Sequence, residues 1–254
     1  MCGICGVHGP HPDPSGETRT MMAALRHRGP DDERLLRVGP TTLGHVRLSI
    51  VDPTGGRQPH RNEDGTVALA GNGEIYNHRH LRERLTGHAF ESEADTDAAL
   101  HLFERDGAAF ARALDGMYAL AIADGRDLLL ARDPLGIKPL YLVRDGPTTW
   151  FASEVKALAH LGRTIEVVPP GTVWHSRLGA RGAWRLPEPS DELRDDWSFD
   201  GMVEDVITAL SRYRWFFVIA RNSSFAYKGQ STDVKRIAHE LGVRYVLEGS
   251  GRKA

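Results

Sequence analysis

The residue with the clearest chemical potential is Cys2, which directly follows Met1. The small side chain of Cys2 is compatible with removal of Met1, and removal would make Cys2 the first residue. A free α-amine titrates near neutral pH, so it can accept the proton of the adjacent thiol. One residue would then supply both a nucleophile and its base. A buried or incidental cysteine is the plainer alternative, and position alone does not overturn it.

Cys5 is the second and last cysteine, and Cys2-Gly3-Ile4-Cys5 has the spacing of redox and zinc motifs. In a strand, residues three apart point to opposite faces, so the two thiols would diverge. No second cysteine pair completes a zinc site, and the twelve histidines lack a metal-ligand spacing paired with further cysteine. The sequence therefore predicts no metal site. Two cysteines fit a reducing cytoplasm better than a disulfide-stabilised secreted scaffold.

The composition is that of an ordinary globular protein. Lys and Arg number 32 against 34 Asp and Glu, so the net charge favours neither nucleic acid nor an anionic membrane surface as a partner. The apolar runs, such as that around Trp215–Ala220, are far shorter than the roughly 20 residues of a membrane-spanning helix. The N-terminus lacks the pattern of a secretory signal. We therefore expect a soluble, cytoplasmic protein.

The first 186 residues contain many short strand patterns and few helical ones. The expected helical stretches are Thr18–Arg26, His80–Leu85 and Asp95–Arg105. The expected strands are Gly3–His8, Thr41–Val51, Thr66–Ala70, Met117–Ala123, Asp127–Arg132, Lys138–Val143 and Trp150–Ala152. This proportion predicts a sheet-rich α+β domain over residues 1–186. Asp133-Pro134-Leu135-Gly136 reads as a turn, and we expect it to be a hairpin connection.

The composition changes after about Leu186. Pro187-Glu188-Pro189-Ser190 opens a polar, acidic stretch, and residues 187–198 are expected to be a linker. Helical and strand patterns then alternate over residues 199–254, which predicts a small α/β fragment. About 55 residues form a marginal unit, because a small domain buries a small fraction of its surface.

Four motifs in one order set Cys2 apart from an incidental cysteine. They are MCGICGV at 1–7, RHRGPD at 26–31, GHVRLSIVD at 44–52 and NGEIYN at 72–77. Together they resemble the class II glutamine amidotransferase domain of glutamine-dependent asparagine synthetase, and the resemblance extends to about Arg185. It implies a four-layer αββα sandwich of the N-terminal-nucleophile hydrolase type. It also implies that Cys2 takes ammonia from the side-chain amide of L-glutamine through a thioester.

The resemblance assigns a role to each motif residue. Arg47 would pair with the substrate α-carboxylate, and its planar fork suits that task. Asp95, with Glu74 assisting, would bind the α-ammonium. Asn72 and the Gly73 N–H would stabilise the tetrahedral oxyanion. Backbone groups would line the pocket at Leu48, Ser49, Ile50 and Val51.

Each assignment has a plain structural alternative. Arg47 could equally be a solvent-exposed residue of a strand. Asn72-Gly73 is also a common sequence for a hairpin turn. Asp95 also fits the cap of a helix that begins near Thr96. Arg26, His27 and Arg28 fit support of the pocket loops as well as a purely structural role. Because the motifs occur together and in order, we favour the functional interpretation for Arg47, Asn72, Gly73 and Asp95.

Two residues depart from the family pattern. Gly71 stands where the family usually has a larger apolar residue, and Ala94 stands where it has a serine. Neither change removes a proposed functional group. Both could loosen the segments that aim those groups.

The motif of the family's second domain, Ser-Gly-Gly-x-Asp-Ser, does not occur after Pro187. The glutaminase reaction is expected to need no cofactor, whereas ATP and Mg belong to that missing synthetase domain. The segment 199–253 instead resembles the start of a TolB-like segment of adenylate-cyclase-type signalling proteins. We therefore expect a glutaminase that supplies ammonia to a synthetase partner, with self-association left open. The alternative is a catalytically idle glutamine-binding or docking module.

Overall fold

The computed structural model describes residues 1–49 and 55–184. The chain divides into two units, Met1–Leu186 and Pro187–Ala254. The predicted linker at 187–198 and the TolB-like α/β segment at 199–254 lie outside the described residues and stay predictions.

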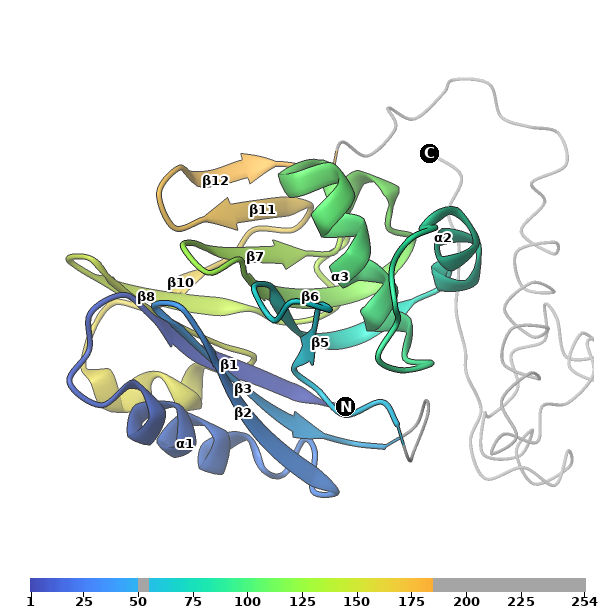
Figure 1. Cartoon of the computed structure of the whole chain (residues 1–254). Helices are drawn as coiled ribbons and strands as arrows, with labels where there is room; N and C mark the ends of the chain where they lie inside the picture. Colours follow the sequence, from blue (N-terminus) through green and yellow to red (C-terminus); the bar gives the residue numbers. More distant parts are fainter. Residues whose placement is uncertain (50–54, 185–254) are drawn as a thin grey trace, which may run out of the picture. The chain divides into compact units, whose positions relative to one another are not determined.

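Two six-stranded sheets form the centre of the first unit (Figure 1), and every strand pair in them is antiparallel. The first sheet has the order β10-β8-β9-β1-β3-β2, with bounds Glu166–Val167, Tyr141–Asp145, Thr148–Ala152, Gly3–His8, Thr41–Arg47 and Asp32–Val38. The second has the order β12-β11-β7-β6-β5-β4, with bounds Gly179–Gly182, Thr172–His175, Leu128–Arg132, Gly116–Ala123, Ala68–Ile75 and His60–Arg61.

Helices cover the outer face of each sheet. Helix α1 (Pro14–Leu25) packs on β1 and β3, and helix α3 (Asp95–Asp106) packs on β5 and on α2 (His78–Arg84). Short 3-10 turns occur at Gly107–Ala113, Val155–Ala157 and Ala159–Leu161.

Three hydrophobic clusters fill the spaces between these layers. One lies between the two sheets and includes Ile4, Leu43 and Phe151. A second joins the second sheet to α2 and α3, and the third joins the first sheet to α1. The sequence of layers is therefore helix, sheet, sheet, helix, which confirms the expected α+β sandwich.

Most predicted elements are present, with shifted ends. Strand β1 has the predicted bounds, and α1 begins at Pro14 instead of Thr18 because the side chain of Asp13 accepts a hydrogen bond from the Gly16 N–H. Strand β2 was not predicted. Its Asp32–Val38 segment is an edge strand with charged, exposed positions, so it lacks the apolar alternation of a half-buried strand.

Two hairpin interpretations are wrong. The alternative of a hairpin turn at Asn72-Gly73 fails because both residues lie inside β5, opposite Ala119 and Tyr118 of β6. The turn at Asp133–Gly136 does form, with the Gly136 N–H donating to the Asp133 carbonyl at 3.0 Å. However, it connects β7 to β8, which belong to different sheets, so it is a crossing between layers and not a hairpin. No helix within the described residues is long and apolar enough to cross a membrane.

The cluster between the sheets provides a test of this layer order. Leu43 is fully buried there. Leu43→Ala is expected to lower the free energy of unfolding by about 2–5 kcal/mol, because the sheets cannot fully close the resulting cavity. Chemical denaturation measures the change. Leu178→Ala is the matched control, since Leu178 is exposed, and equal losses in the two variants would contradict the layer order.

Candidate active site

A cavity of about 210 Å³ opens where the N-terminus, the end of β3, the middle of β5 and the start of α3 meet. This volume is below the roughly 300–1,000 Å³ of drug-sized sites, so it suits a small ligand. The lining residues are Met1, Cys2, Arg47, Leu48, Gly56, Gln58, Gly71, Asn72, Gly73, Glu74, Ala94, Asp95, Met117 and Lys138. Segments that are distant in sequence thus contribute to a single cavity.

The thiol of Cys2 lies at the start of β1, beside the end of β3. The Leu48 N–H donates to Cys2 Sγ at 3.4 Å, and Cys2 Sγ lies 3.7 Å from the Leu48 carbonyl oxygen. Cys5, in contrast, is fully buried against α1, and burial raises the pKa of its thiol far above the ordinary value. The two cysteines therefore have different environments, and Cys2 alone lines the cavity.

Two side chains hold the backbone of Cys2. Arg28 Nε donates to the Cys2 carbonyl oxygen at 2.8 Å. The Asn72 amide is best oriented with Nδ2 donating to the same oxygen at 3.0 Å and Oδ1 accepting from Arg28 Nη2 at 3.2 Å. The second N–H of that amide is not needed for this contact. Asn72 can therefore position Cys2 and still offer one donor to a ligand.

Arg28 is in turn fixed by Glu154. Arg28 Nη1 donates to Glu154 Oε1 at 2.7 Å, and His27 Nε2 lies 3.1 Å from the same oxygen. Burial alone would raise the pKa of Glu154, but the hydrogen bonds from Arg28, His27 and Lys156 lower it below the ordinary value. The structure therefore gives Arg28 and His27 the supporting place that the sequence left open, while Arg26 pairs with Glu33 on the surface.

Asp95 is the first residue of α3 and lies against β5. Its Oδ2 accepts the Ile75 N–H at 2.5 Å. Ala94 is the N-cap and no side chain caps the helix, so the alternative of Asp95 as the cap is wrong. Burial raises the pKa of Asp95, and the N–H groups of Ile75 and Thr96 lower it in part. A cation in the cavity would be a suitable partner for this carboxylate.

The remaining predicted residues fall into three groups. Arg47 is buried at the end of β3, so it is not a solvated strand residue. Leu48 and Glu74 line the cavity, whereas Ser49 is not among the lining residues and its N–H donates to Asp31 Oδ2 at 2.7 Å. Ile50 and Val51 lie outside the described residues, and their part in the pocket stays a prediction.

Sequence reasoning missed two polar lining residues. The Gln58 side chain accepts the Gly71 N–H at 2.6 Å, and Lys138 directs its Nζ to within 3.7 Å of Met1 Sδ. Lys138 follows the Asp133–Gly136 turn, and Asp133 Oδ2 accepts its backbone N–H at 3.0 Å. Lys138 could not be predicted to line the cavity, because the turn was expected to connect neighbouring strands of one sheet and instead connects the two sheets.

The two departures from the family pattern have local compensation. A Cβ at Gly71 would lie 2.9 Å from both Leu120 and Thr96, so glycine suits the close packing of β5. The Ala94 N–H donates to Ser92 Oγ at 3.2 Å, and the Ala94 carbonyl oxygen accepts from Arg82 at 2.8 Å. Other side chains thus hold the segment that leads to Asp95.

Comparison with known proteins matches residues 1–171 to the family described as "Glutamine amidotransferase domain". The chain belongs to this family. The asparagine synthetase [glutamine-hydrolyzing] 3 of Arabidopsis thaliana is 42% identical over 211 residues, covering 80% of this chain and 36% of the relative. The corresponding protein 2 of Oryza sativa subsp. japonica is 42% identical over 195 residues, covering 74% and 33%. The match thus spans about a third of the length of these relatives.

Solved structures show the same fold. The glutamine phosphoribosylpyrophosphate amidotransferase of B. subtilis superposes with a TM-score of 0.61 at 25% identity, over 71% of this chain and 48% of that chain. A second structure, titled as the allosteric regulatory enzyme of purine biosynthesis, gives a TM-score of 0.64 at 24% identity, over 73% and 50%. The expected sandwich of the N-terminal-nucleophile type is therefore confirmed for this glutamine amidotransferase domain.

The ion pair between Arg28 and Glu154 gives the amidotransferase domain a pH-dependent contribution to stability. Glu154→Gln removes the charge while keeping the size, and it is expected to cost about 1–3 kcal/mol at pH 7. Because the folded pKa of Glu154 is lowered, wild type holds this stabilisation above the ordinary pKa of 4.5 and loses it as the pH falls through the folded value. The difference in free energy of unfolding between wild type and Glu154→Gln should therefore become smaller below pH 4.5.

Urea denaturation at pH 7 and at lower pH measures this difference. The matched control is Glu83→Gln, since the Glu83 side chain is 78% exposed and its nearest ionic partner, His80, lies 4.0 Å away. If Glu154→Gln lowers the free energy of unfolding by the same amount at both pH values, the ion pair is not the cause of the loss.

Proposed function

We propose that the N-terminal unit hydrolyses L-glutamine to L-glutamate and ammonia through a thioester on Cys2. The observation that carries the proposal is the single cavity, which collects a thiol, a buried cation, a buried anion and the Asn72 amide. Family membership supports the same activity.

The two charged residues suit the amino-acid end of glutamine. Arg47 would bind the α-carboxylate through two parallel N–H donors, and Asp95 would bind the α-ammonium with help from Glu74. Both Arg47 and Asp95 are buried, so each ion pair would form in a site with little competing water. A free α-amino acid carries both of the charges that these two residues would bind, so the site favours a ligand of that class. Leu48, Ser49, Ile50 and Val51 would complete the wall beside Arg47.

The thiol and the terminal amine would perform the chemistry at the other end. After removal of Met1, the Cys2 amine accepts the thiol proton, and Sγ attacks the side-chain carbonyl carbon of glutamine. Negative charge develops on the carbonyl oxygen, where the free N–H of Asn72 and the Gly73 N–H would stabilise it. The C–N bond then breaks, and the leaving nitrogen takes the proton to depart as ammonia. The thioester on Cys2 remains.

A water molecule completes the turnover. It attacks the thioester carbon while the Cys2 amine accepts one of its protons, and the same two donors stabilise the second oxyanion. Collapse releases glutamate and restores the thiol. These steps need only water and groups of the chain.

Ammonia released in this way would serve a synthetase partner, of the asparagine-forming kind for which the relatives are named. ATP and Mg would act in that partner's domain. Cytoplasmic location and self-association stay predictions.

Removal of Met1 is the first requirement of the proposal. Processed protein, identified by intact mass, is expected to release ammonia from glutamine, and Cys2→Ala should reduce the rate to background. A form that keeps an N-terminal extension should bind glutamine and release no ammonia, because its α-nitrogen is an amide that cannot act as the base. Ammonia release by the extended form would contradict the role of the amine. Binding without turnover by processed wild type would favour the idle glutamine-binding module.

The oxyanion role of Asn72 makes a separate prediction. Asn72→Ala is expected to lower kcat by about 10²–10³-fold with a smaller change in KM, since the lost donor acts mainly on the transition state. Asn77→Ala is the matched control because Asn77 lies beyond the end of β5 and does not line the cavity. A rise in KM with unchanged kcat in Asn72→Ala would contradict an oxyanion role.

A further inference from the structure

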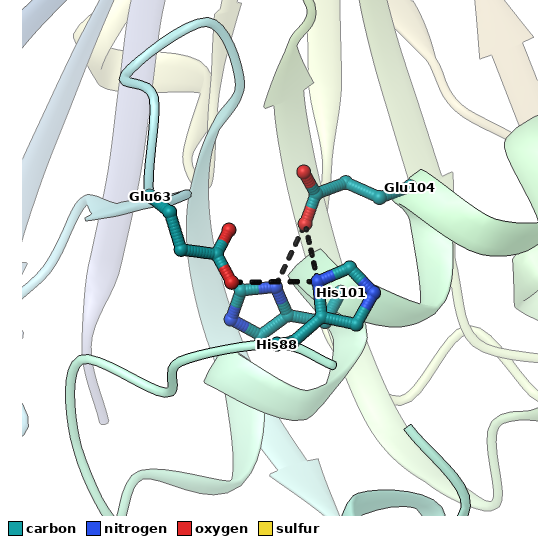
Figure 2. Close-up of side chains that lie close together, drawn as sticks. All are labelled: Glu63, His88, His101 and Glu104. Atoms are coloured by element: carbon teal, nitrogen blue, oxygen red, sulfur yellow. Dashed lines mark hydrogen bonds and ion pairs between the residues drawn. The ribbon is translucent and has the colours of Figure 1, made fainter. Parts of the chain in front are cut away.

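A second group of side chains, here called the outer cluster, includes two residues of α3 and shares no residue with the lining of the cavity. Figure 2 shows Glu63, His88, His101 and Glu104 converging from three segments. Glu63 precedes β5, His88 lies between α2 and α3, and the other two lie one turn apart on α3. Their ligand atoms all lie within 4.8 Å of one another. The proposed glutaminase reaction uses none of them.

The distances between these atoms approach those of a tetrahedral metal site. His88 Nδ1 lies 3.5 Å from Glu63 Oε1 and 3.5 Å from Glu104 Oε2, and His101 Nδ1 lies 2.7 Å from Glu104 Oε2. Around zinc, bonds of about 2.0–2.2 Å separate neighbouring ligand atoms by about 3.3–3.5 Å. Of the three atom pairs just given, the two that involve His88 Nδ1 already have this spacing. The third pair, now in direct hydrogen-bond contact, would have to open by less than about 1 Å.

Hydrogen bonds outside the cluster hold its carboxylates in place. Glu63 Oε1 accepts the Ala89 N–H at 2.6 Å, and Glu104 Oε1 accepts from Asn62 Nδ2 at 2.7 Å. Glu104 therefore turns its other oxygen, Oε2, toward the histidines. Metal ligands in proteins commonly have such oriented outer contacts.

His101 provides the most specific observation. Its side chain is fully buried, and its Nε2 lies 3.8 Å from Asp97 Oδ1, which comes from the preceding turn of α3. Both atoms are buried without a hydrogen-bond partner among residues 1–49 and 55–184. A small shift would let Nε2–H donate to Asp97, and the lone pair of Nδ1 would then face the cluster. A carboxylate behind a histidine in this way is the usual support of a zinc-binding imidazole.

We propose that Glu63, His88, His101 and Glu104 bind one zinc ion. Two imidazoles and two carboxylates suit zinc better than the hard cations Mg²⁺ and Ca²⁺, which take oxygen ligands. The ion would connect the loop before β5, the loop before α3 and α3 itself. The site was not predicted from the sequence, because its histidines lie on different segments and have no cysteine partner.

The structural alternative is an ion-paired cluster without metal. In that case the His101 ring contacts Glu104 through Nδ1 and Asp97 through Nε2, with no ion between the side chains. Zinc titration separates the two arrangements, because the metal site would bind one zinc ion per chain and the ion-paired cluster would bind none.

The test measures zinc binding to the full chain by isothermal titration, after removal of metals with a chelator. Cys2→Ala is used as the background, because a free thiol can bind zinc by itself. One zinc ion per chain is expected. His88→Gln should weaken binding at least about 100-fold. Asp97→Asn, which alters the support of His101 and also the contacts with Ser92 and Arg82, should weaken it about 10–100-fold. His80→Gln is the matched control, since His80 is on the exposed face of α2 and lies outside the cluster.

Thermal unfolding gives an independent readout. Zinc should raise the Tm of the background protein and of His80→Gln, and leave that of His88→Gln unchanged. Glu63→Gln, at an exposed position, serves as a second ligand variant should His88→Gln fail to fold. Absence of stoichiometric zinc binding in the background protein would overturn the proposal. Equal zinc affinity in the background protein and in the ligand variants would overturn it as well.

Discussion

The cavity depends on one contact between the two sheets, the clamp on the carbonyl oxygen of Cys2. Arg28 donates to this oxygen from the segment after α1, and Asn72 donates to it from β5 of the second sheet. Without the clamp, the first residues would be a free chain end, and chain ends fray unless they are tied down. Glu154 completes the arrangement by neutralising Arg28. Cys2 therefore becomes a fixed part of the cavity wall because side chains hold its backbone carbonyl oxygen.

The same contact explains why the motifs could be found from the sequence. Cys2, Arg28 and Asn72 are far apart along the chain, yet each lies in a motif of recognisable composition, so their order alone indicated a shared cavity. Strand β1 could be predicted because its buried residues end cleanly at turn residues. The position of Asn72-Gly73 inside a strand could not be predicted, since this pair of residues locally favours a hairpin turn. Pairing along the whole of β5 with β6 overrides that preference.

Other features could not be predicted from the sequence because they depend on contacts between segments that are distant along the chain. The Asp133–Gly136 turn has the local chemistry of a hairpin, and only the assignment of β7 and β8 to separate sheets shows that it crosses between layers. Lys138 reaches the cavity for that reason. The histidines were likewise judged by spacing along the chain, whereas His88 and His101 come together because the loop before α3 folds back onto the helix. Phe90 of that loop packs edge-on against the His101 ring, 4.8 Å between centroids.

Helix α3 links the two sites. Its first residue, Asp95, faces the cavity, while Asp97, His101 and Glu104 take part in the outer cluster or support it. The Ser92 N–H donates to Asp97 at 2.8 Å, and Arg82 binds the carbonyl oxygens of Ser92 and Ala94. Asp97 and Arg82 therefore fix the loop that enters α3. Because no side chain caps α3, these contacts hold the segment that leads to Asp95, and the Ile75 N–H of β5 holds the Asp95 carboxylate itself.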